Sequence, residues 1–386
     1  MKHLRRSTRE LCFVLVFFLS VSVSALNSNQ SEIQNQSSFQ VHTFSGGTDA
    51  YSDFLNIDDA VMTKTPDLGH TVIYDLIDNA KISIHLMIYH LTDELVVSKL
   101  IEAQKRGVEV SIIFDNKTAS FGNAKILFQR LLDAGIHIVK SSSGFSISHV
   151  KSFSVDNKIL FISTMNFIKS FATMRDYGLT TSEPSLIAEY ESVFATDLQN
   201  SQTGGTVTPV LSVNNLVWSP VNSRDKLTAL IDSAQNEVRL TVENITDAYI
   251  TASLGNAAKR GVTVRVLTPE CVYGGAYNNE RALKTLNEWG ADTRVMPNPV
   301  SADVPYMHSK TISIDDKIAF IGSENFSINS LSYAREFGII FKNNKAISFL
   351  NETFDQDWGK SVKFASLPAG HCDSFNGAFK SALDVD

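Results

Sequence analysis

The stretch His149-Val-Lys-Ser-Phe-Ser-Val-Asp156 returns later in the chain as His308-Ser-Lys-Thr-Ile-Ser-Ile-Asp315. Each copy places a Lys two residues after its His, an Asp seven residues after the His, and an Asn ten residues after the Asp, at Asn166 and Asn325. One copy would be a weak signal, because four fixed residues recur by chance. Two copies in register indicate an internal duplication in which both copies keep a chemical role.

The sequence before each copy repeats as well. Residues 82–88 and 238–242 both alternate apolar and polar side chains as strands do. Lys105-Arg-Gly-Val108 reappears 154 residues later as Lys259-Arg-Gly-Val262. In each repeat a helix ended by Gly is followed by a buried strand, which predicts βα units and a sheet rich in parallel strands.

The doubled pattern resembles the phospholipase D superfamily, the HKD phosphodiesterases, in the two-motif form of bacterial phospholipase D and cardiolipin synthase-like proteins. The resemblance implies an α/β fold of two duplicated α/β sandwich halves, with mixed sheets flanked by helices, related by a pseudo-twofold axis. We expect these halves at residues 45–200 and 212–362, joined by the loop-forming residues 201–206. We expect a monomer, because the resemblance implies that both halves form one active site.

Six residues of the motifs can supply phosphodiester chemistry. Cleavage needs a nucleophile for phosphorus, a proton donor for the leaving oxygen, and donors that neutralise the phosphoryl charge. Two His, two Lys and two Asn provide these groups without a metal or another cofactor: His149, Lys151, Asn166, His308, Lys310 and Asn325. The resemblance suggests His149 as the nucleophile and His308 as the acid and base, although the chemistry alone allows the reverse.

The two motif Asp residues follow the strands that carry the His and Lys. Asp156-Asn157 and Asp315-Asp316 are typical of hairpin turns, and apolar returning strands come after them. On a straight strand, an offset of seven also points each Asp away from the face of its His. We interpret Asp156 and Asp315 as supporting residues that shape hairpins, with a catalytic role as the alternative.

The returning strands end differently in the two halves. The second ends in Gly322-Ser-Glu-Asn325, the usual family ending, whereas the first ends in Ser163-Thr-Met-Asn166. Thr164 keeps the hydroxyl of Ser323, but its β-branch stiffens the side chain. We expect Thr164 and Ser323 to support the phosphate site, and we expect the loss of Gly in the first half to restrict a tight bend.

Two further acidic residues are candidate supporting residues. Asp176 and Glu336 follow the motif Asn residues by ten and eleven positions, and each comes directly after an Arg. They could hold the tautomers of the two His side chains. The alternative is that they form surface salt bridges with Arg175 and Arg335.

The N-terminus predicts export. Basic residues precede an apolar run over residues 11–23, which ends in small residues, so residues 1–25 are typical of a secretory signal peptide. An uncleaved signal anchor in the membrane is the alternative, although the run is shorter than a membrane span. We expect the mature protein to be secreted or to reside in a periplasm or lumen. The polar residues 26–44 predict a flexible arm.

The C-terminal tail, residues 363–386, has no counterpart in the first half. It carries one of the two cysteines that remain after signal cleavage, Cys372, and the other is Cys271. An exported chain could join them in a disulfide, and two buried free thiols are the alternative.

The substrate must be inferred from composition and from the residues around the motifs. Loss of residues 1–25 removes four basic residues and one acidic residue, which leaves a net charge of −10. This charge argues against an extended nucleic-acid track. Apolar residues near the motifs, such as Phe145, Tyr306, Tyr273 and Tyr277, could instead face acyl chains at a membrane surface, with packing inside buried loops as the commoner explanation.

We therefore expect a phospholipase D that hydrolyses phospholipids to phosphatidic acid and a head-group alcohol through a phosphohistidine. Three alternatives stay open. The chain could be an exported nuclease or other phosphodiesterase, or a transphosphatidylase of the cardiolipin synthase kind. It could also be an interaction protein whose site is catalytically dead.

Overall fold

The computed structural model describes residues 51–272, 279–368, 370–373 and 375. The predicted signal peptide and polar arm lie outside the described residues, as do residues 369, 374 and 376–386 of the tail. Among the helices that are described, none combines the length and the apolar character needed to cross a bilayer.

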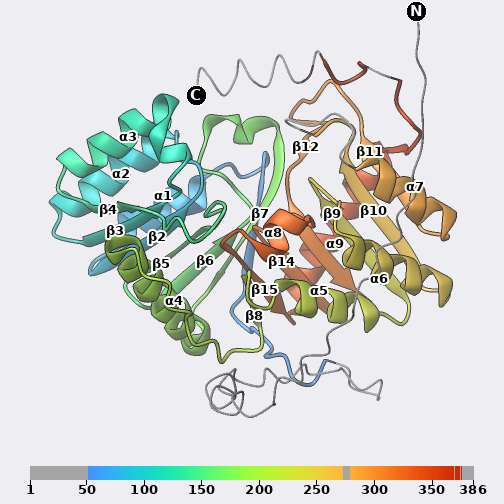
Figure 1. The fold of residues 1–386 in the computed structure, drawn as a ribbon, viewed down its shortest axis with the longest axis horizontal. Helices are drawn as coiled ribbons and strands as arrows, with labels where there is room; N and C mark the ends of the chain where they lie inside the picture. The colour runs from blue at the N-terminus through green and yellow to red at the C-terminus, as the bar shows by residue number, and fades with distance from the viewer. Residues whose placement is uncertain (1–50, 273–278, 369, 374, 376–386) are drawn as a thin grey trace, which may run out of the picture. The chain divides into compact units, whose positions relative to one another are not determined.

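The first half is built on a mixed sheet in the order β1-β7-β6-β5-β2-β3-β4 (Figure 1). Its strands are β1 (Val61–Thr65), β2 (Ser83–Ile88), β3 (Glu109–Phe114), β4 (His137–Lys140), β5 (Lys151–Val155), β6 (Ile159–Ser163) and β7 (Met174–Thr181). One face is covered by α1 (Thr71–Asn79), α2 (Glu94–Lys105) and α3 (Gly122–Asp133), and the other by α4 (Pro184–Thr203).

The second half repeats this plan, with the sheet order β16-β11-β10-β9-β13-β14-β15-β8. Its strands are β8 (Leu216–Ser219), β9 (Glu237–Val242), β10 (Thr263–Pro269), β11 (Asp292–Met296), β13 (Lys310–Ile314), β14 (Ile318–Gly322), β15 (Glu336–Phe341) and β16 (Val362–Lys363). The helices α5 (Ser223–Asp232), α6 (Ala248–Lys259), α7 (Glu280–Glu288) and α8 (Ile328–Ser332) cover one face, and α9 (Asn344–Lys360) covers the other.

The predicted α/β fold of two duplicated halves is confirmed. In both sheets three neighbouring strands run parallel, β2-β3-β4 and β9-β10-β11, while the motif strands and their returning strands pair antiparallel. Gly107 and Gly261 follow α2 and α6 with φ of 89° and 91°, a conformation that favours glycine. Asp93 and Asp247 begin the same two helices by accepting hydrogen bonds from backbone N–H groups of the first turn.

The two sheets share a hydrophobic core. It joins apolar side chains of β6 and β7 to those of β8, β14 and β15, and α4 and α9 complete it. Trp218 stacks on Phe337 here at a ring-centroid distance of 4.0 Å, and both are fully buried. β12 (Tyr306–Met307), from the second half, pairs with β7 of the first sheet. The halves are therefore joined by apolar burial and by backbone hydrogen bonds.

Two buried ion pairs cross between the halves in equivalent positions. Arg175 donates to Asp357 of α9 through Nε at 2.7 Å, and Arg335 donates to Asp197 of α4 through Nε at 2.7 Å. Both guanidinium groups make a second hydrogen bond to the same carboxylate. Since both Arg side chains bind these carboxylates, the alternative that they pair with Asp176 and Glu336 at the surface is wrong. Bidentate pairs of this kind also fix orientation.

Two local features differ from or extend the sequence prediction. The joint between the halves was expected to begin at residue 201, but α4 continues to Thr203 and ends at Gly204, whose φ is 69°. In the second half, Cys271 and Cys372 form a disulfide that ties the described part of the tail to the segment after β10. The pairing was one of the two alternatives for these cysteines.

Candidate active site

A cleft of about 680 Å³ lies where the two halves meet, and both motifs contribute to it. Its polar lining includes the two motif His and the two motif Asn side chains, with Tyr89, His90, Glu243 and Asn244 beside them. Apolar side chains complete the lining: Ile147, Ile168, Met174 and Val272. The structure therefore brings together side chains that lie up to 159 residues apart in equivalent motif positions.

Backbone contacts across the seam place the two His residues. The N–H of His149 donates to the carbonyl of Arg335 at 2.8 Å, and the N–H of Ser309 donates to the carbonyl of Arg175 at 2.9 Å. The segment before each motif strand therefore lies against Arg175 or Arg335 of the other half. Asp176 and Glu336 directly follow these two Arg residues. This arrangement sets each His beside a carboxylate of the opposite half.

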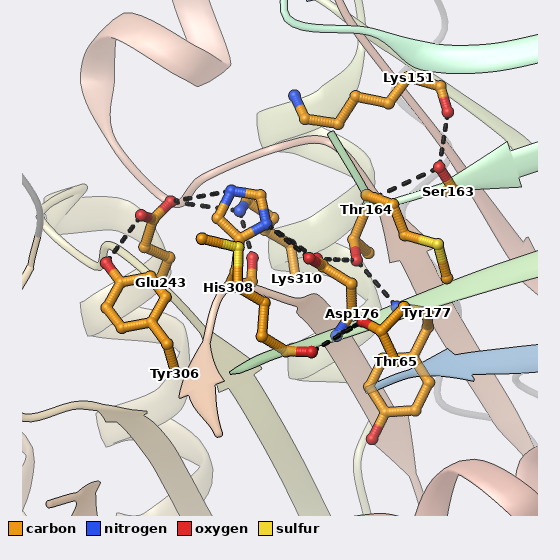
Figure 2. Close-up of polar contacts among 12 residues, drawn as sticks. Thr65, Lys151, Ser163, Thr164, Asp176, Tyr177, Glu243, Tyr306, His308 and Lys310 are labelled. Atoms are coloured by element: carbon orange, nitrogen blue, oxygen red, sulfur yellow. Dashed lines mark hydrogen bonds and ion pairs between the residues drawn. The ribbon is translucent and has the colours of Figure 1, made fainter. Parts of the chain in front are cut away.

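Each imidazole is held at Nδ1 by that carboxylate. His149 Nδ1 lies 2.9 Å from Oε2 of Glu336, and His308 Nδ1 lies 2.8 Å from Oδ1 of Asp176. Figure 2 shows His308 between Asp176 on one side and Glu243 on the other. A carboxylate accepts the Nδ1 proton, so Nε2 is the nitrogen left for chemistry in the cleft.

The environment of the first-half imidazole favours its neutral form. Burial lowers the pKa of His149, although Glu336 opposes that shift. Burial alone would raise the pKa of Glu336, but the His149 imidazole beside it holds that pKa below its usual value. Glu336 also accepts from the Ser330 hydroxyl at 2.6 Å. A neutral imidazole with a protonated Nδ1 offers its Nε2 lone pair to an electrophile.

Both motif Lys side chains are fully buried beside their own His. Lys151 Nζ donates to the carbonyl of His149 at 2.5 Å, and Lys310 Nζ donates to the carbonyl of His308. Burial lowers the pKa of Lys151 to about 7, with a further contribution from the charge of Lys310. The two ammonium groups are therefore fixed near the imidazoles, where they could neutralise a phosphoryl group.

The motif Asn residues line the same cleft. Asn325 donates through Nδ2 to Glu243 at 3.3 Å and accepts through Oδ1 from the Asn244 N–H at 3.3 Å. Among the described residues, the buried Oδ1 of Asn166 has no hydrogen-bond partner. Both amides therefore line the cleft that holds the two imidazoles, where they could donate to phosphoryl oxygens.

Asp156 and Asp315 lie in the hairpin turns that the sequence predicts, at φ of 56° and 55°. Asp156 accepts from the backbone N–H groups of Lys81, Ile82 and Ser83 at 2.6 to 3.0 Å. Asp315 accepts in the same way from residues 235–237. These carboxylates tie each hairpin to the start of the neighbouring strand, and neither lines the cleft.

The reason for Gly at the second-half ending differs from our expectation. Gly322 does not adopt positive φ, so backbone freedom is not what the position requires. A Cβ there would lie 2.2 Å from Oε2 of Glu324 and 2.7 Å from the Cα of Gly338, so Gly322 is required by close packing. The first half has Met165 where the second has Glu324, and Ser163 fits there with its hydroxyl donating to the Lys151 carbonyl at 2.6 Å.

The hydroxyls of Thr164 and Ser323 accept hydrogen bonds from the backbone of β7 and of its counterpart β15. Thr164 donates through Oγ1 to Asp176 and accepts from the Tyr177 N–H at 3.0 Å (Figure 2). Ser323 Oγ accepts from the Phe337 N–H at 3.0 Å, and its carbonyl lies 3.1 Å from His149 Nδ1. Both residues therefore hold the carboxylate strand and one imidazole in place.

Among the cleft residues that sequence reasoning missed are Tyr89, His90 and Glu243. Tyr89 packs edge-on against His149 at a ring-centroid distance of 4.5 Å, and Lys151 Nζ lies 5.0 Å from the Tyr89 ring centre. His90 follows Tyr89 and also lines the cleft, and burial lowers its pKa to about 4. Glu243 lies at the position equivalent to Tyr89. The signal that could have found them is their place directly after a repeated buried strand.

The side chain of Tyr306 is buried and does not form an apolar surface at the entrance of the cleft. Tyr306 is 1% exposed, and its hydroxyl donates to Oε1 of Glu243 at 2.9 Å. For Tyr306 the structure therefore supports buried packing and not contact with acyl chains, because its ring is buried and its polar end is used inside the site. Residues 273–278, which include Tyr273 and Tyr277, lie outside the described residues.

Comparison with known proteins places these features in a family. The family described as cardiolipin synthase, PLD-like domain, matches residues 73–198 and 227–358, one match in each half. The probable cardiolipin synthase YwiE of Bacillus subtilis (strain 168) is 23% identical over 333 residues, covering 76% of this chain and 65% of YwiE. A phospholipase D of Rickettsia bellii is 35% identical over 106 residues, covering 27% of this chain and 50% of its own length.

A solved structure shows the same fold. The phosphatidylserine synthase of Haemophilus influenzae Rd KW20 superposes with a TM-score of 0.66 at 10% identity, covering 86% of this chain and 94% of the synthase. The match to YwiE spans slightly less than two thirds of that relative's length.

Proposed function

The chain belongs to the cardiolipin synthase, phospholipase D-like family, and on that premise we propose that it transfers the phosphatidyl group of a phospholipid to an alcohol through a phosphohistidine. The observation that carries the proposal is the pair of imidazoles in one cleft, each held at Nδ1 by a carboxylate of the opposite half. This arrangement presents one Nε2 for attack and one for proton transfer.

In the proposed first step, His149 Nε2 attacks phosphorus and forms a P–N bond. The P–O bond to the head group breaks, and His308 gives its Nε2 proton to the departing alkoxide. In the second step, His308 takes the proton of an acceptor alcohol, whose oxygen attacks phosphorus and releases His149. The motif Lys and Asn side chains would neutralise and orient the phosphoryl oxygens.

The relatives favour transfer to an alcohol over the hydrolysis that we expected from the sequence. The family and YwiE both bear the name of a synthase. Hydrolysis differs only in that water replaces the alcohol, and the local similarity to a phospholipase D keeps it as the second candidate. The apolar side chains at the cleft and the net negative charge of the chain favour a lipid over a nucleic acid.

The test uses vesicles of labelled phosphatidylglycerol, with a chelator present in a parallel sample. We expect cardiolipin and glycerol, insensitive to the chelator, and loss of both products in His149→Ala and His308→Ala. Phosphatidic acid as the only lipid product would replace transfer by hydrolysis. Cleavage of single-stranded DNA without lipid turnover would indicate a nuclease, and inactivity on both substrates would indicate an interaction protein.

A further inference from the structure

The two halves of the cleft differ at the residue that directly follows two equivalent strands. The strands β2 and β9 are equivalent, and the residue that follows each of them is Tyr89 in the first half and Glu243 in the second. Both side chains line the cleft. The first half therefore places an aromatic ring beside its His and Lys, whereas the second half places a carboxylate there.

Glu243 is bound by the groups that the second motif offers to a phosphate. Its Oε2 lies 3.2 Å from Lys310 Nζ, 3.3 Å from Asn325 Nδ2 and 3.7 Å from His308 Nε2. One Lys, one Asn and one His thus converge on a single carboxylate oxygen. That oxygen occupies the place where the second motif would hold a phosphoryl oxygen.

The carboxylate is charged and fixed. Burial would raise the pKa of Glu243, but Lys310 and His308 beside it hold that pKa well below its usual value. The Tyr306 hydroxyl donates to the second carboxylate oxygen at 2.9 Å and limits rotation (Figure 2). The Glu243 side chain is 14% exposed, so it faces the cleft and a bound anion would feel its charge.

The negative charge of Glu243 discriminates between bound anions that carry different numbers of negative charges. A phosphodiester carries one negative charge, whereas a phosphomonoester carries up to two at neutral pH. The repulsion from one carboxylate therefore acts about twice as strongly on the dianion. Burial in the cleft strengthens this difference, because charges are screened less there than in open water.

We propose that Glu243 makes the site selective for monoanionic phosphodiesters over dianionic phosphomonoesters. The inference deepens the proposed function, on which it rests, by naming the charge state of substrate that the site accepts. Glu243 takes one phosphoryl-oxygen position with its own negative charge, and the diester binds the motif donors that remain. A monoester, such as the product of a competing hydrolysis, is repelled from the cleft.

The proposed charge selectivity can be tested by measuring anion binding, which requires no catalytic turnover. Sulfate and methyl sulfate share a tetrahedral sulfur but carry two charges and one charge at about pH 6.5. Calorimetric titration of the wild type should show methyl sulfate binding at least as tightly as sulfate. In Glu243→Gln, the dissociation constant of sulfate should fall at least about tenfold further than that of methyl sulfate.

Glu237→Gln is the matched control. It removes the same charge from the first residue of β9, the strand that Glu243 follows. Glu237 pairs there with Arg239 and Arg265 and does not line the cleft. It should change both anions equally and by little. An equal change for both anions in Glu243→Gln, or a wild type that prefers sulfate, would overturn the inference. The wild-type comparison stands even if Glu243→Gln does not fold.

The two proposals fail separately. If vesicles give no lipid product but sulfate is excluded by Glu243, the lipid substrate is wrong and the charge selectivity holds. If cardiolipin forms but Glu243→Gln binds both anions as the wild type does, the charge selectivity is wrong and the transfer holds.

Discussion

Lys151 must be charged to bind a phosphoryl oxygen, yet it is fully buried. Burial lowers its pKa to about 7, and Lys310 adds to the shift while Glu336 opposes it. At the scale of the residue, burial therefore gives Lys151 a pKa near neutrality, so that its ammonium group loses its proton close to neutral pH. A bound monoanion would restore the proton, because an opposite charge favours the ammonium form.

Binding of dimethyl phosphate should therefore depend on pH. Its own charge does not change near neutrality, whereas Lys151 is charged below about pH 7 and neutral above it. We expect its affinity, measured by calorimetry, to fall as the pH rises from about 6 to about 8. Lys151→Arg should flatten this fall, because a guanidinium stays charged. Constant wild-type affinity over that range would contradict the assignment, as would an unchanged fall in Lys151→Arg.

At the scale of the element, the hairpins between β5 and β6 and between β13 and β14 carry the motif Asp residues. Asp156 and Asn157 both adopt positive φ, the pattern of the tight turns that suit the twist of paired strands. The Asp156 carboxylate also holds three backbone N–H groups of the segment before β2. The hairpin thus fixes the end of the strand that begins at Lys151.

Asp156→Ala should lower the free energy of unfolding by about 1–3 kcal/mol, because three N–H groups lose their charged acceptor. Urea unfolding measures the loss, and Asp156→Asn should lose less because Asn keeps an acceptor and tolerates the turn. Burial would raise the pKa of Asp156, but these N–H groups hold it below 3.8. Its contribution is therefore present above that pH and is lost as the pH falls through the folded-state pKa.

Activity separates this supporting role from a catalytic one. Turnover per folded molecule should stay within about threefold of the wild type in Asp156→Ala, because the hairpin lies outside the cleft. A loss as large as that of His149→Ala, in a variant that stays folded, would instead assign Asp156 to the chemistry.

At the scale of the whole molecule, each half completes the site of the other. Glu336 holds His149, Asp176 holds His308, and the sequence separations are 187 and 132 residues. The buried ion pairs Arg175–Asp357 and Arg335–Asp197 also join the two halves. In each pair, one half supplies the Arg and the other half supplies the Asp. The packing of the two halves is therefore a condition for positioning either imidazole.

Glu336→Gln and Asp176→Asn should each lower kcat by about 10²–10⁴, because the imidazole loses the carboxylate that sets its tautomer. Steady-state turnover on the phospholipid measures this loss. Asp197→Asn is the control: it breaks a buried ion pair across the seam without touching an imidazole, and should cost about 3–5 kcal/mol of stability. Near-normal kcat in Glu336→Gln would show that His149 needs no carboxylate.

Much of the fold could be predicted because its signals are local. Strand alternation, the Gly after α2 and α6, and the Asp residues of the hairpins are each set by nearby backbone geometry, and the duplication showed them twice. Glu243 was missed for the opposite reason. It breaks the repeat, and its partners Lys310 and Asn325 lie 67 and 82 residues away. The sequence left the burial of Tyr306 open, because exposure depends on packing that the residue type does not determine.

The sequence by itself determined the duplicated α/β fold and the residue types that the cleft could use. Only the tertiary structure decided how they combine. It showed that each His takes its carboxylate from the opposite half, and that the Glu243 carboxylate binds Lys310 of the second motif. The physical reason is that hydrogen bonds and charge pairs act over a few ångströms, so they are set by the packing of the halves and not by position along the chain.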